Sequence, residues 1–398
     1  MDHEPPRSFE RDPAADHESE TDAYVEPPPP PPQPLRGRGA SSNRSGRYER
    51  RGYEAFDDGW SADVAEVSER GVAPGRTRVR PLASRTAMAR NDSPDIPFDR
   101  SLNPYRGCEH GCVYCFARPD HAYLGHSPGL DFEQLIFAKH DIVASLRAEW
   151  AKPGYRPETM AIGASTDPYQ PVEGDLRLTR GVLELALACR HPVAIVTKSA
   201  RVTRDIDLLQ QLAALDLVRV FVSLTSLDAS LQRTLEPRAS APQARLRAIE
   251  ALDRAGIPVG VLASPMIPAI NDDELEAILE AARAAGARSA GWILLRLPRE
   301  VGPLFEDWLT AWKPERKERV LALMRSMRGG ELYDATFGKR MRGEGPYAAL
   351  LARRFELAHK RLGFLDSFPP PRTDLFVAPE RARRAAVEAA PSRQLRLL

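Results

Sequence analysis

From about residue 98 to residue 295, short apolar runs alternate with amphipathic stretches, and this alternation limits the fold more than any other feature of the sequence. The apolar runs have the length and composition of buried strands: Thr159–Ser165, Pro192–Thr197, Leu217–Leu224, Pro258–Ser264 and Ser289–Leu295. The stretches between them carry apolar residues at helical spacing: Leu176–Arg190, Thr203–Leu215, Pro242–Ala255 and Asp272–Ala285. The pattern therefore predicts strand–helix pairs in a regular order.

Such an order indicates βα units around a parallel sheet. With a first short strand near Ser101–Asn103, the chain has about six units, fewer than the eight that close a full barrel. We therefore predict an α/β fold, a partial (βα)6 TIM-like barrel, in a core domain of residues 91–300. A helical C-terminal extension over residues 301–368 and a loose tail over residues 369–398 follow it.

Residues 1–90 have a different composition from the rest of the chain. Pro27 to Pro32 is an unbroken proline run, and an Arg/Gly tract over residues 36–39 follows it. The segment has too few apolar residues to offset the entropy of ordering, so we predict a disordered N-terminal extension that the folded core does not need. An Arg/Gly tract can attract the phosphates of RNA or DNA, although a solvated tail is the simpler interpretation.

Whole-chain properties indicate an ordinary soluble protein. The formal net charge is +1, which by itself favours neither a nucleic-acid binder nor an acidic partner. The four cysteines are too few for a secreted disulfide scaffold, and no apolar run reaches the ~18–20 residues that span a bilayer. The N-terminus lacks a basic region followed by an apolar core. We expect a cytoplasmic monomer with no membrane association.

Three of the four cysteines lie within eight residues, as Cys108, Cys112 and Cys115. Three thiolates spaced C-x3-C-x2-C on one loop can bind one face of a cubane iron–sulfur cluster, which normally takes four cysteines. Cys189 lies in an apolar helical segment, where a cysteine usually serves as a small buried hydrophobe. Three ligands leave one iron open for a substrate or cofactor.

The longer stretch over residues 103–115 reads Asn-Pro-Tyr-Arg-Gly-Cys-x-His-Gly-Cys-x-Tyr-Cys. It resembles the signature of the radical S-adenosylmethionine (SAM) superfamily, in the branch related to spore photoproduct lyase and often labelled DNA-repair photolyase-like. The resemblance implies a [4Fe–4S] cluster on the three cysteines, and SAM that is cleaved reductively to methionine and a 5′-deoxyadenosyl radical. It also implies a reductant protein such as flavodoxin or ferredoxin.

The same resemblance assigns SAM contacts at strand ends, because ligands of parallel βα folds bind there. After the second strand, most members use a Gly-Gly-Glu-like turn for the SAM amino group; this chain departs from it with Thr166 and Asp167. An acceptor oxygen and a carboxylate can still receive hydrogen bonds from an ammonium group. The alternative is that Asp167 and Pro168 merely begin a turn.

Two further strand ends carry polar side chains. Lys198 follows the third strand and would meet the SAM carboxylate, or else it is a surface residue at a helix approach. Ser223 and Thr225 share one face of the fourth strand with Phe221, which suggests a polar cavity unless their hydroxyls bond the backbone.

The segment Leu235-Glu236-Pro237-Arg238 also resembles this branch. Arg238 would clamp the SAM carboxylate, or else form a salt bridge with Glu236. The resemblance further implies that Tyr114, before the third cysteine, borders the adenine together with Leu294 and Leu295 of the sixth strand.

Three functional hypotheses follow. The favoured one is a radical SAM enzyme, lyase-like or an oxidoreductase, whose unknown substrate is related to nucleic acid or DNA repair. The second is an iron–sulfur or zinc protein that binds nucleic acid without SAM chemistry. His110 would be the fourth zinc ligand, but its place between the first two cysteines suits a tetrahedral site poorly. The third is a radical SAM enzyme acting on a small molecule or peptide.

Two details bear on the nucleic-acid hypothesis. The lyase depends on a cysteine hydrogen donor just before the turn at the second strand, whereas this chain has no cysteine between Cys115 and Cys189. Dimer reversal by the lyase's route is therefore not expected. At the C-terminus, Gln394–Leu398 resembles the short peptide by which bacterial DNA-repair proteins bind the sliding clamp, and its leucines would fill an apolar pocket.

Overall fold

A computed structural model describes residues 34–48, 76–84 and 86–382, all of which lie in one compact unit of the chain. The proline run and the clamp-like peptide Gln394–Leu398 lie outside the described residues. Within the part that is described, none of the helices combines the length and apolar character that a membrane crossing requires.

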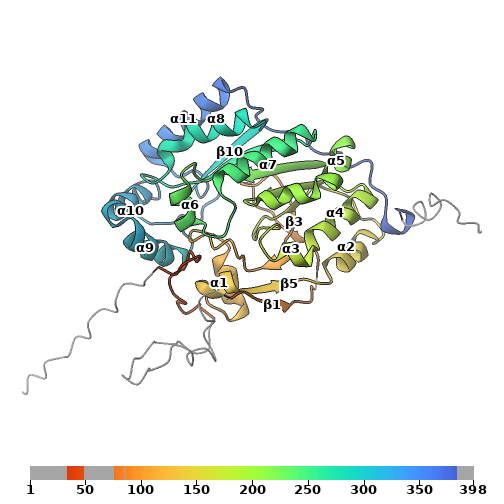
Figure 1. Cartoon of the computed structure of the whole chain (residues 1–398), viewed down its shortest axis with the longest axis horizontal. Coiled ribbons are helices and arrows are strands. Elements are labelled where there is room, and N and C mark those ends of the chain that lie inside the picture. Colours follow the sequence, from red (N-terminus) through yellow and green to blue (C-terminus); the bar gives the residue numbers. More distant parts are fainter. Residues whose placement is uncertain (1–33, 49–75, 85, 383–398) are drawn as a thin grey trace, which may run out of the picture. The chain divides into compact units, whose positions relative to one another are not determined.

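The main sheet has the order β10-β9-β8-β7-β6-β3-β2, and Figure 1 labels its strands β10 and β3. Its six parallel strands are β3 (Arg100–Leu102), β6 (Met160–Ile162), β7 (Val193–Thr197), β8 (Val218–Ser223), β9 (Val259–Met266) and β10 (Ser289–Leu294). A two-residue strand, β2 (Ala89–Arg90), pairs antiparallel with β3 at one edge. The six strands lie where the apolar runs predict them, which confirms the partial barrel.

A helix follows each of the four central strands of this sheet. These helices are α4 (Leu178–Cys189) after β6, α5 (Ile206–Ala214) after β7, α7 (Pro242–Arg254) after β8 and α8 (Leu275–Ala284) after β9. In α8 the buried residues are Leu275, Ile278, Leu279 and Ala282, whose spacing places them on one helix face. The helices α5, α7 and α8 pack by such faces on β8 and β9.

A second, smaller sheet is absent from the sequence-based prediction. It consists of β1 (Arg78–Pro81), β5 (Leu135–Ala138) and β4 (Tyr105–Arg106), in the order β1-β5-β4. The helices α1 (Leu130–Gln134) and α2 (Ile142–Trp150) flank β5 in the chain. All four residues of β1 are exposed, so the strand has no alternation of apolar and polar residues that would predict it.

The prediction that residues 1–90 are disordered needs correction in two parts of that segment. Residues 76–84 and 86–90 contain the short strands β1 and β2, and residues 34–48, which we call the strap, pack on the core. Ala40 of the strap is 1% exposed and belongs to the main hydrophobic core. The strap is held by polar contacts of its backbone and of its arginine and asparagine side chains with distant segments, which composition does not reveal.

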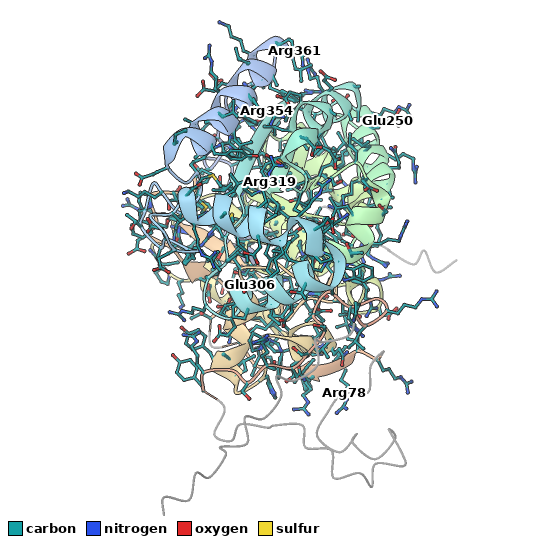
Figure 2. The ribbon with its side chains drawn as sticks, turned by 90° about the vertical axis from the view of Figure 1, so that its left-hand side faces the viewer. Arg78, Glu250, Glu306, Arg319, Arg354 and Arg361 are labelled. Carbon is teal, nitrogen blue, oxygen red and sulfur yellow. The ribbon has the colours of Figure 1, made fainter. Side chains whose placement is uncertain are left out.

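The C-terminal extension consists of α9 (Val301–Trp312), α10 (Lys317–Ser326) and α11 (Gly345–Arg361). Figure 2 shows the charged side chains of these helices, with Arg354 and Arg361 along α11. Arg354 pairs with Glu276 and Arg361 with Glu280, so two ion pairs join α11 to α8. The described part of the predicted loose tail also packs on the barrel, because the Val377 N–H donates to the Cys189 carbonyl at 2.9 Å.

Candidate functional site

The cysteine loop begins just after β3, at the carboxyl edge of the main sheet. Its backbone is tied to neighbouring segments: the Cys108 N–H donates to the Phe132 carbonyl at 2.8 Å, and the Val113 N–H donates to the Leu235 carbonyl at 3.1 Å. Cys108 and Cys112 are each 7% exposed, and Cys115 is half-buried. The loop therefore holds three thiols in a largely water-free environment at the sheet edge where ligands bind.

Burial raises the pKa of all three thiols. The charge of Asp167 raises the pKa of Cys108 further, while the backbone N–H groups of Asp167 and His110 oppose the rise. The thiols also lie near enough to one another that Cys108 and Cys115 both raise the pKa of Cys112. Buried thiols of this kind become thiolates only beside a strong positive charge, which an iron–sulfur cluster supplies. The donor set fits such a cluster.

A single zinc ion suits these residues less well. Zinc needs ligands that converge on one atom, and among residues 34–48, 76–84 and 86–382 no group of three or more His, Cys, Asp or Glu side chains is so placed. His110 is already engaged, because its Nδ1 lies 3.4 Å from Oδ2 of Asp167. The thiolates of a cubane instead bind different irons, so they need not converge on one point.

Asp167 connects the cysteine loop with the ends of two strands. Its Oδ1 accepts from the Thr197 hydroxyl at 2.7 Å and from the Tyr169 N–H at 2.9 Å, and its Oδ2 accepts from the Lys198 N–H at 2.6 Å. Burial disfavours the charged carboxylate, yet His110 and these hydrogen bonds lower its pKa. The adjacent Thr166 hydroxyl donates to the Tyr105 carbonyl at 2.8 Å. In the structure both predicted SAM ligands have partners within the protein.

Glu236 is the centre of a buried polar cluster beside Cys112. It follows α6 (Ala229–Leu235), has no exposed surface, and accepts hydrogen bonds from Arg245 and the Tyr114 hydroxyl. Its Oε1 lies 2.6 Å from the Thr225 hydroxyl. Burial would raise the pKa of Glu236, but Arg245 and then Lys198 hold it well below its usual range. Tyr114 is thus fixed by its hydroxyl group.

The side chain of Lys198 is largely buried, so the alternative of a surface lysine is wrong. Its side chain is 17% exposed, and its Nζ lies 3.5 Å from Oε1 of Glu236 and 3.3 Å from the Ser264 carbonyl. The same Nζ lies 5.9 Å from the centre of the Tyr114 ring. Because its polar neighbours are at long hydrogen-bond distances, the ammonium group retains capacity for a further anionic partner.

Arg238 and Ser223 are the two remaining predicted contacts. The predicted alternative of an Arg238–Glu236 salt bridge is wrong: Arg238 Nη2 lies 3.0 Å from Oε1 of Glu109, and its Nη1 donates to the Thr77 hydroxyl at 3.1 Å. Glu236 instead turns inward to Arg245. Ser223 is buried at the end of β8, where its carbonyl accepts from Arg245 at 3.0 Å.

The predicted SAM residues other than Arg238 are therefore brought together, while Arg238 pairs with Glu109 of the cysteine loop. Near them, Oγ of Ser264, at the carboxyl end of β9, is buried and has no hydrogen-bond partner in the described part of the chain. A buried polar atom without a partner is costly, and a polar ligand would satisfy it. Ser264 and Lys198 together fit a ligand with both hydroxyl and carboxylate groups, as SAM has.

A second buried ion pair, between Arg118 and Glu133, lies against the backbone of the cysteine loop. Arg118 and Glu133 have no exposed side-chain surface, and their charged groups lie 2.5 Å apart. Arg118 also donates to the carbonyls of Cys112 at 2.9 Å and Gly111 at 3.3 Å. This arginine thus fixes the backbone of the cysteine loop at Gly111 and Cys112.

The strap completes this support. The N–H groups of Gly39 and Ala40 donate to the Glu133 carboxylate at 3.1 and 2.8 Å. A Cβ atom on Gly39 would lie 1.8 Å from the Gly111 carbonyl oxygen, so only glycine permits this approach. The strap therefore presses directly on the loop that carries the cysteines.

Sequence analysis missed these supporting residues. Arg245 had a detectable signal, because it shares the buried face of α7 with Ala248, Ile249 and Leu252. A charged residue on an apolar helix face indicates a buried partner. Arg118, Glu133 and Gly39 offered no such signal, since their contacts join segments about 15 and 94 residues apart.

Comparison with known proteins agrees with this geometry. The family model described as the radical SAM superfamily matches residues 102–282. An uncharacterized protein of Mycobacterium tuberculosis is 38% identical over 232 residues, which cover 58% of this chain and 68% of that protein. An uncharacterized protein of Methanocaldococcus jannaschii is 26% identical over 173 residues, covering 44% of this chain and 62% of that protein.

Among solved structures, the fold is similar to that of spore photoproduct lyase. The complex of that lyase with dinucleoside spore photoproduct has a TM-score of 0.52 at 17% identity, covering 75% of this chain and 87% of the lyase. A mutant of the lyase with bound AdoMet and dinucleoside spore photoproduct has a TM-score of 0.52 at 16% identity, covering 73% and 82%. At these identities the likeness establishes the fold alone.

Proposed function

Because this chain belongs to the radical SAM superfamily and is an enzyme of the radical SAM type, we propose that Cys108, Cys112 and Cys115 bind its [4Fe–4S] cluster. The observation that carries the proposal is the set of three thiols on one loop, two buried and one half-buried, with the ammonium group of Lys198 close to the loop's Tyr114. The hypothesis of a nucleic-acid-binding protein without SAM chemistry is not retained, because membership of the superfamily contradicts it.

When bound, the cluster supplies an electron for the reductive cleavage of SAM, which yields methionine and a 5′-deoxyadenosyl radical that takes a hydrogen atom from the substrate. The residues of this chain bind and orient. Lys198 would pair with the SAM carboxylate, Ser264 would supply a hydroxyl group, and Tyr114, held by Glu236, would border the adenine. Asp167 links the cysteine loop to the end of β7 through its contacts with His110, Thr197 and the Lys198 N–H.

The buried polar cluster also excludes water from the neighbourhood of Cys112. Glu236 and Arg245 have 0% and 1% exposed side-chain surface, and each satisfies the other. A reactive radical needs such a site because water and stray side chains would otherwise intercept it. An external one-electron donor, of the flavodoxin or ferredoxin type, and a cytoplasmic location belong to the same proposal.

We further propose that the substrate is a nucleic acid. Phe116, the residue after Cys115, is 43% exposed, and the guanidinium of Arg296 lies 5.0 Å from its ring centre. Tyr333 lies 5.9 Å from the same guanidinium. Aromatic rings beside arginines form stacking and phosphate-binding surfaces for unpaired bases. The lyase of similar fold, whose complex contains a dinucleoside photoproduct, adds support.

The test is an anaerobic assay of 5′-deoxyadenosine formation by reconstituted protein, with reductant and SAM, in the presence and absence of damaged DNA. We expect SAM cleavage by the parent protein, and faster cleavage when substrate is present. Phe116→Ala and Arg296→Gln should remove the stimulation by DNA but keep the slow cleavage without it. SAM cleavage that no form of DNA or RNA stimulates would contradict the proposed substrate, while absence of cleavage would contradict the proposed chemistry.

A further inference from the structure

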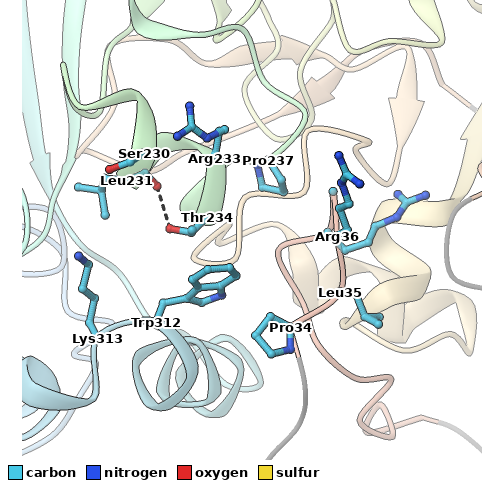
Figure 3. A pocket seen from close by; sticks show the side chains of 12 residues that line it. Pro34, Leu35, Arg36, Ser230, Leu231, Arg233, Thr234, Pro237, Trp312 and Lys313 are labelled. Atoms are coloured by element: carbon cyan, nitrogen blue, oxygen red, sulfur yellow. Dashed lines mark hydrogen bonds between the residues drawn. The ribbon is translucent and has the colours of Figure 1, made fainter.

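A pocket of about 670 Å³ lies outside the cluster site, between the strap, α6 and the end of α9 (Figure 3). Strap residues 34–38 form one wall, and residues of α6 with Pro237 form another. Trp312 and Lys313, at the end of α9, close the third side. The volume is in the range typical of small-molecule sites in proteins.

The charges that line this pocket are all positive. Of the residues that the structure describes, those lining the pocket include Arg36, Arg38, Arg233 and Lys313 and no Asp or Glu side chain. Within the described residues, the side chains of Arg36, Arg233 and Lys313 form no ion pair or hydrogen bond. The carboxylate of Asp228 caps α6 by accepting from the Ser230 N–H, and hydrogen bonds from Ser230 are the main cause that lowers its pKa, with the charge of Lys313 acting in the same direction. Unpaired cations around one concavity attract an anionic ligand.

An aromatic ring is available in the same pocket. Trp312 is 44% exposed and projects from α9 toward α6. Trp308, one helical turn earlier, is 2% exposed and donates through its indole N–H to the Thr234 carbonyl at 3.0 Å. Trp308 thus anchors α9 to α6, whereas Trp312 leaves a large apolar ring uncovered beside three unpaired cations. A ligand with a flat ring and negative charge would cover both.

We propose that this pocket binds a phosphate-bearing nucleotide unit, with its base stacked on Trp312 and its phosphate paired with Arg36, Arg233 and Lys313. A nucleotide combines the two features that the lining offers, a π-face and phosphate charge. The unit comes either from a free nucleotide or from a single strand of nucleic acid. The site is distinct from the carboxyl edge of the sheet, so it stands whatever the substrate of the radical reaction is.

The strap couples the pocket to the cysteine loop. Arg38 lines the pocket and donates to the Glu133 carbonyl at 3.2 Å, and its neighbour Gly39 touches Gly111. Pro237 lines the pocket too, and its Cγ would lie 3.3 Å from a Cβ on Gly111. A nucleotide unit in the pocket therefore lies directly behind the backbone of the cysteine loop.

The test measures binding to the cluster-loaded full chain, without SAM or reductant, so that its outcome does not depend on radical chemistry. Fluorescence anisotropy follows a labelled single strand of about 12 nucleotides, with a mononucleotide, the matching duplex and inorganic pyrophosphate as competitors. The variants are Arg36→Gln, Arg233→Gln, Lys313→Gln, Trp312→Leu and Trp312→Phe. Arg254→Gln, on α7 with 75% side-chain exposure, is the control for loss of one surface charge.

We expect Trp312→Leu to weaken binding at least about 5-fold and Trp312→Phe to weaken it less, because stacking tolerates another ring. Each cation variant should reduce the slope of log affinity against log salt by about 0.7, and Arg254→Gln should not. Tighter binding of the strand than of the mononucleotide identifies the strand as the source, and equal binding identifies the free nucleotide. Equal affinity of all pocket variants and the parent, or competition by pyrophosphate as strong as by nucleotides, would overturn the proposal.

Discussion

Glu236 shows how a single residue can organise this site. Its carboxylate has no exposed surface and lies between the guanidinium of Arg245 and the ammonium of Lys198. Removing the charge of Glu236 leaves Arg245 buried and unpaired, a loss that typically costs about 3–5 kcal/mol. We therefore expect Glu236→Gln to lower the free energy of unfolding by about 3 kcal/mol in urea denaturation.

The matched control is Glu250→Gln, on the exposed side of α7. Glu250 pairs with Arg254, but the two side chains are 44% and 75% exposed, so water screens the pair. This variant should stay within about 0.5 kcal/mol of the parent protein. Similar losses in both variants would mean that the Glu236–Arg245 pair contributes nothing beyond an ordinary surface pair.

His191 predicts a pH dependence of stability. Burial lowers its pKa to about 3, and the nearby charge of Arg100 acts in the same direction. The neutral ring stacks on Trp150 at 4.0 Å, and its Nε2 lies 2.7 Å from the Tyr155 hydroxyl. An unfolded chain binds a proton on this histidine near pH 6.5, whereas the folded chain does not until about pH 3. Stability must therefore fall as pH decreases through this window.

The measurement is urea denaturation of parent and His191→Gln proteins between pH 7 and pH 4.5. The contribution of His191 to the loss should be about 2–3 kcal/mol, so the variant, although less stable at pH 7, should show a flatter profile. Exposed His140→Gln serves as the control and should keep the parent profile. Parallel profiles for the parent protein and His191→Gln would rule out this histidine as the titrating group.

Residue patterns revealed some of the site and not the rest. Cysteine spacing and strand ends located the loop, Lys198 and Asp167, because those features are local in the sequence. Asp167 nevertheless has a different immediate role: it holds His110, Thr197 and the Lys198 backbone. Which atom a carboxylate meets depends on contacts between distant segments, and residue type alone does not determine them.

At the scale of elements, the contacts of the strap predict that it is needed, whereas composition predicts that it is dispensable. Composition makes residues before about 90 dispensable, yet Gly39 and Ala40 supply two N–H groups to the buried Glu133 carboxylate. Without them the carboxylate loses donors, at a cost of about 1–3 kcal/mol for each unsatisfied buried group. A chain that begins at residue 49 should therefore lose its cluster in air faster than the full chain.

The decay of the cluster's visible absorbance measures this effect. A chain that begins at Pro34, at the first described residue of the strap, is the matched control and should match the full chain. Gly39→Val should reproduce the effect of the longer deletion, because its side chain has no space beside Gly111. If the chain beginning at residue 49 kept its cluster as long as the full chain, the strap would be only a passive covering.

The elements themselves were predicted unevenly. The strands and helices of the barrel have apolar faces with clear periodicity, as α8 shows, and their positions follow from the sequence. The small sheet does not, because β1 is wholly exposed and β4 has two residues. Short strands held by backbone pairing carry little signal in their side chains.

At the scale of the whole molecule, the order of the main sheet places the cysteine loop, Asp167, Lys198 and Ser264 at one edge. The cysteine loop follows β3, Asp167 follows β6, Lys198 follows β7 and Ser264 lies near the end of β9. The carboxyl ends of parallel strands in sequential order lie at the same edge of the sheet. The position of the site can therefore be predicted once the strands are located in the sequence. The supporting ion pairs could not be predicted in this way, because they depend on contacts between segments that are distant in the sequence.

The central claim is that three cysteines of this chain bind a [4Fe–4S] cluster. Anaerobic metal analysis with Mössbauer spectroscopy of the reconstituted protein tests it most directly. We expect about four irons per chain in the parent protein and in Cys189→Ala, and loss of the cluster in Cys108→Ala, Cys112→Ala and Cys115→Ala. Stoichiometric zinc without iron, or a cluster that survives each of the three loop substitutions, would contradict the account.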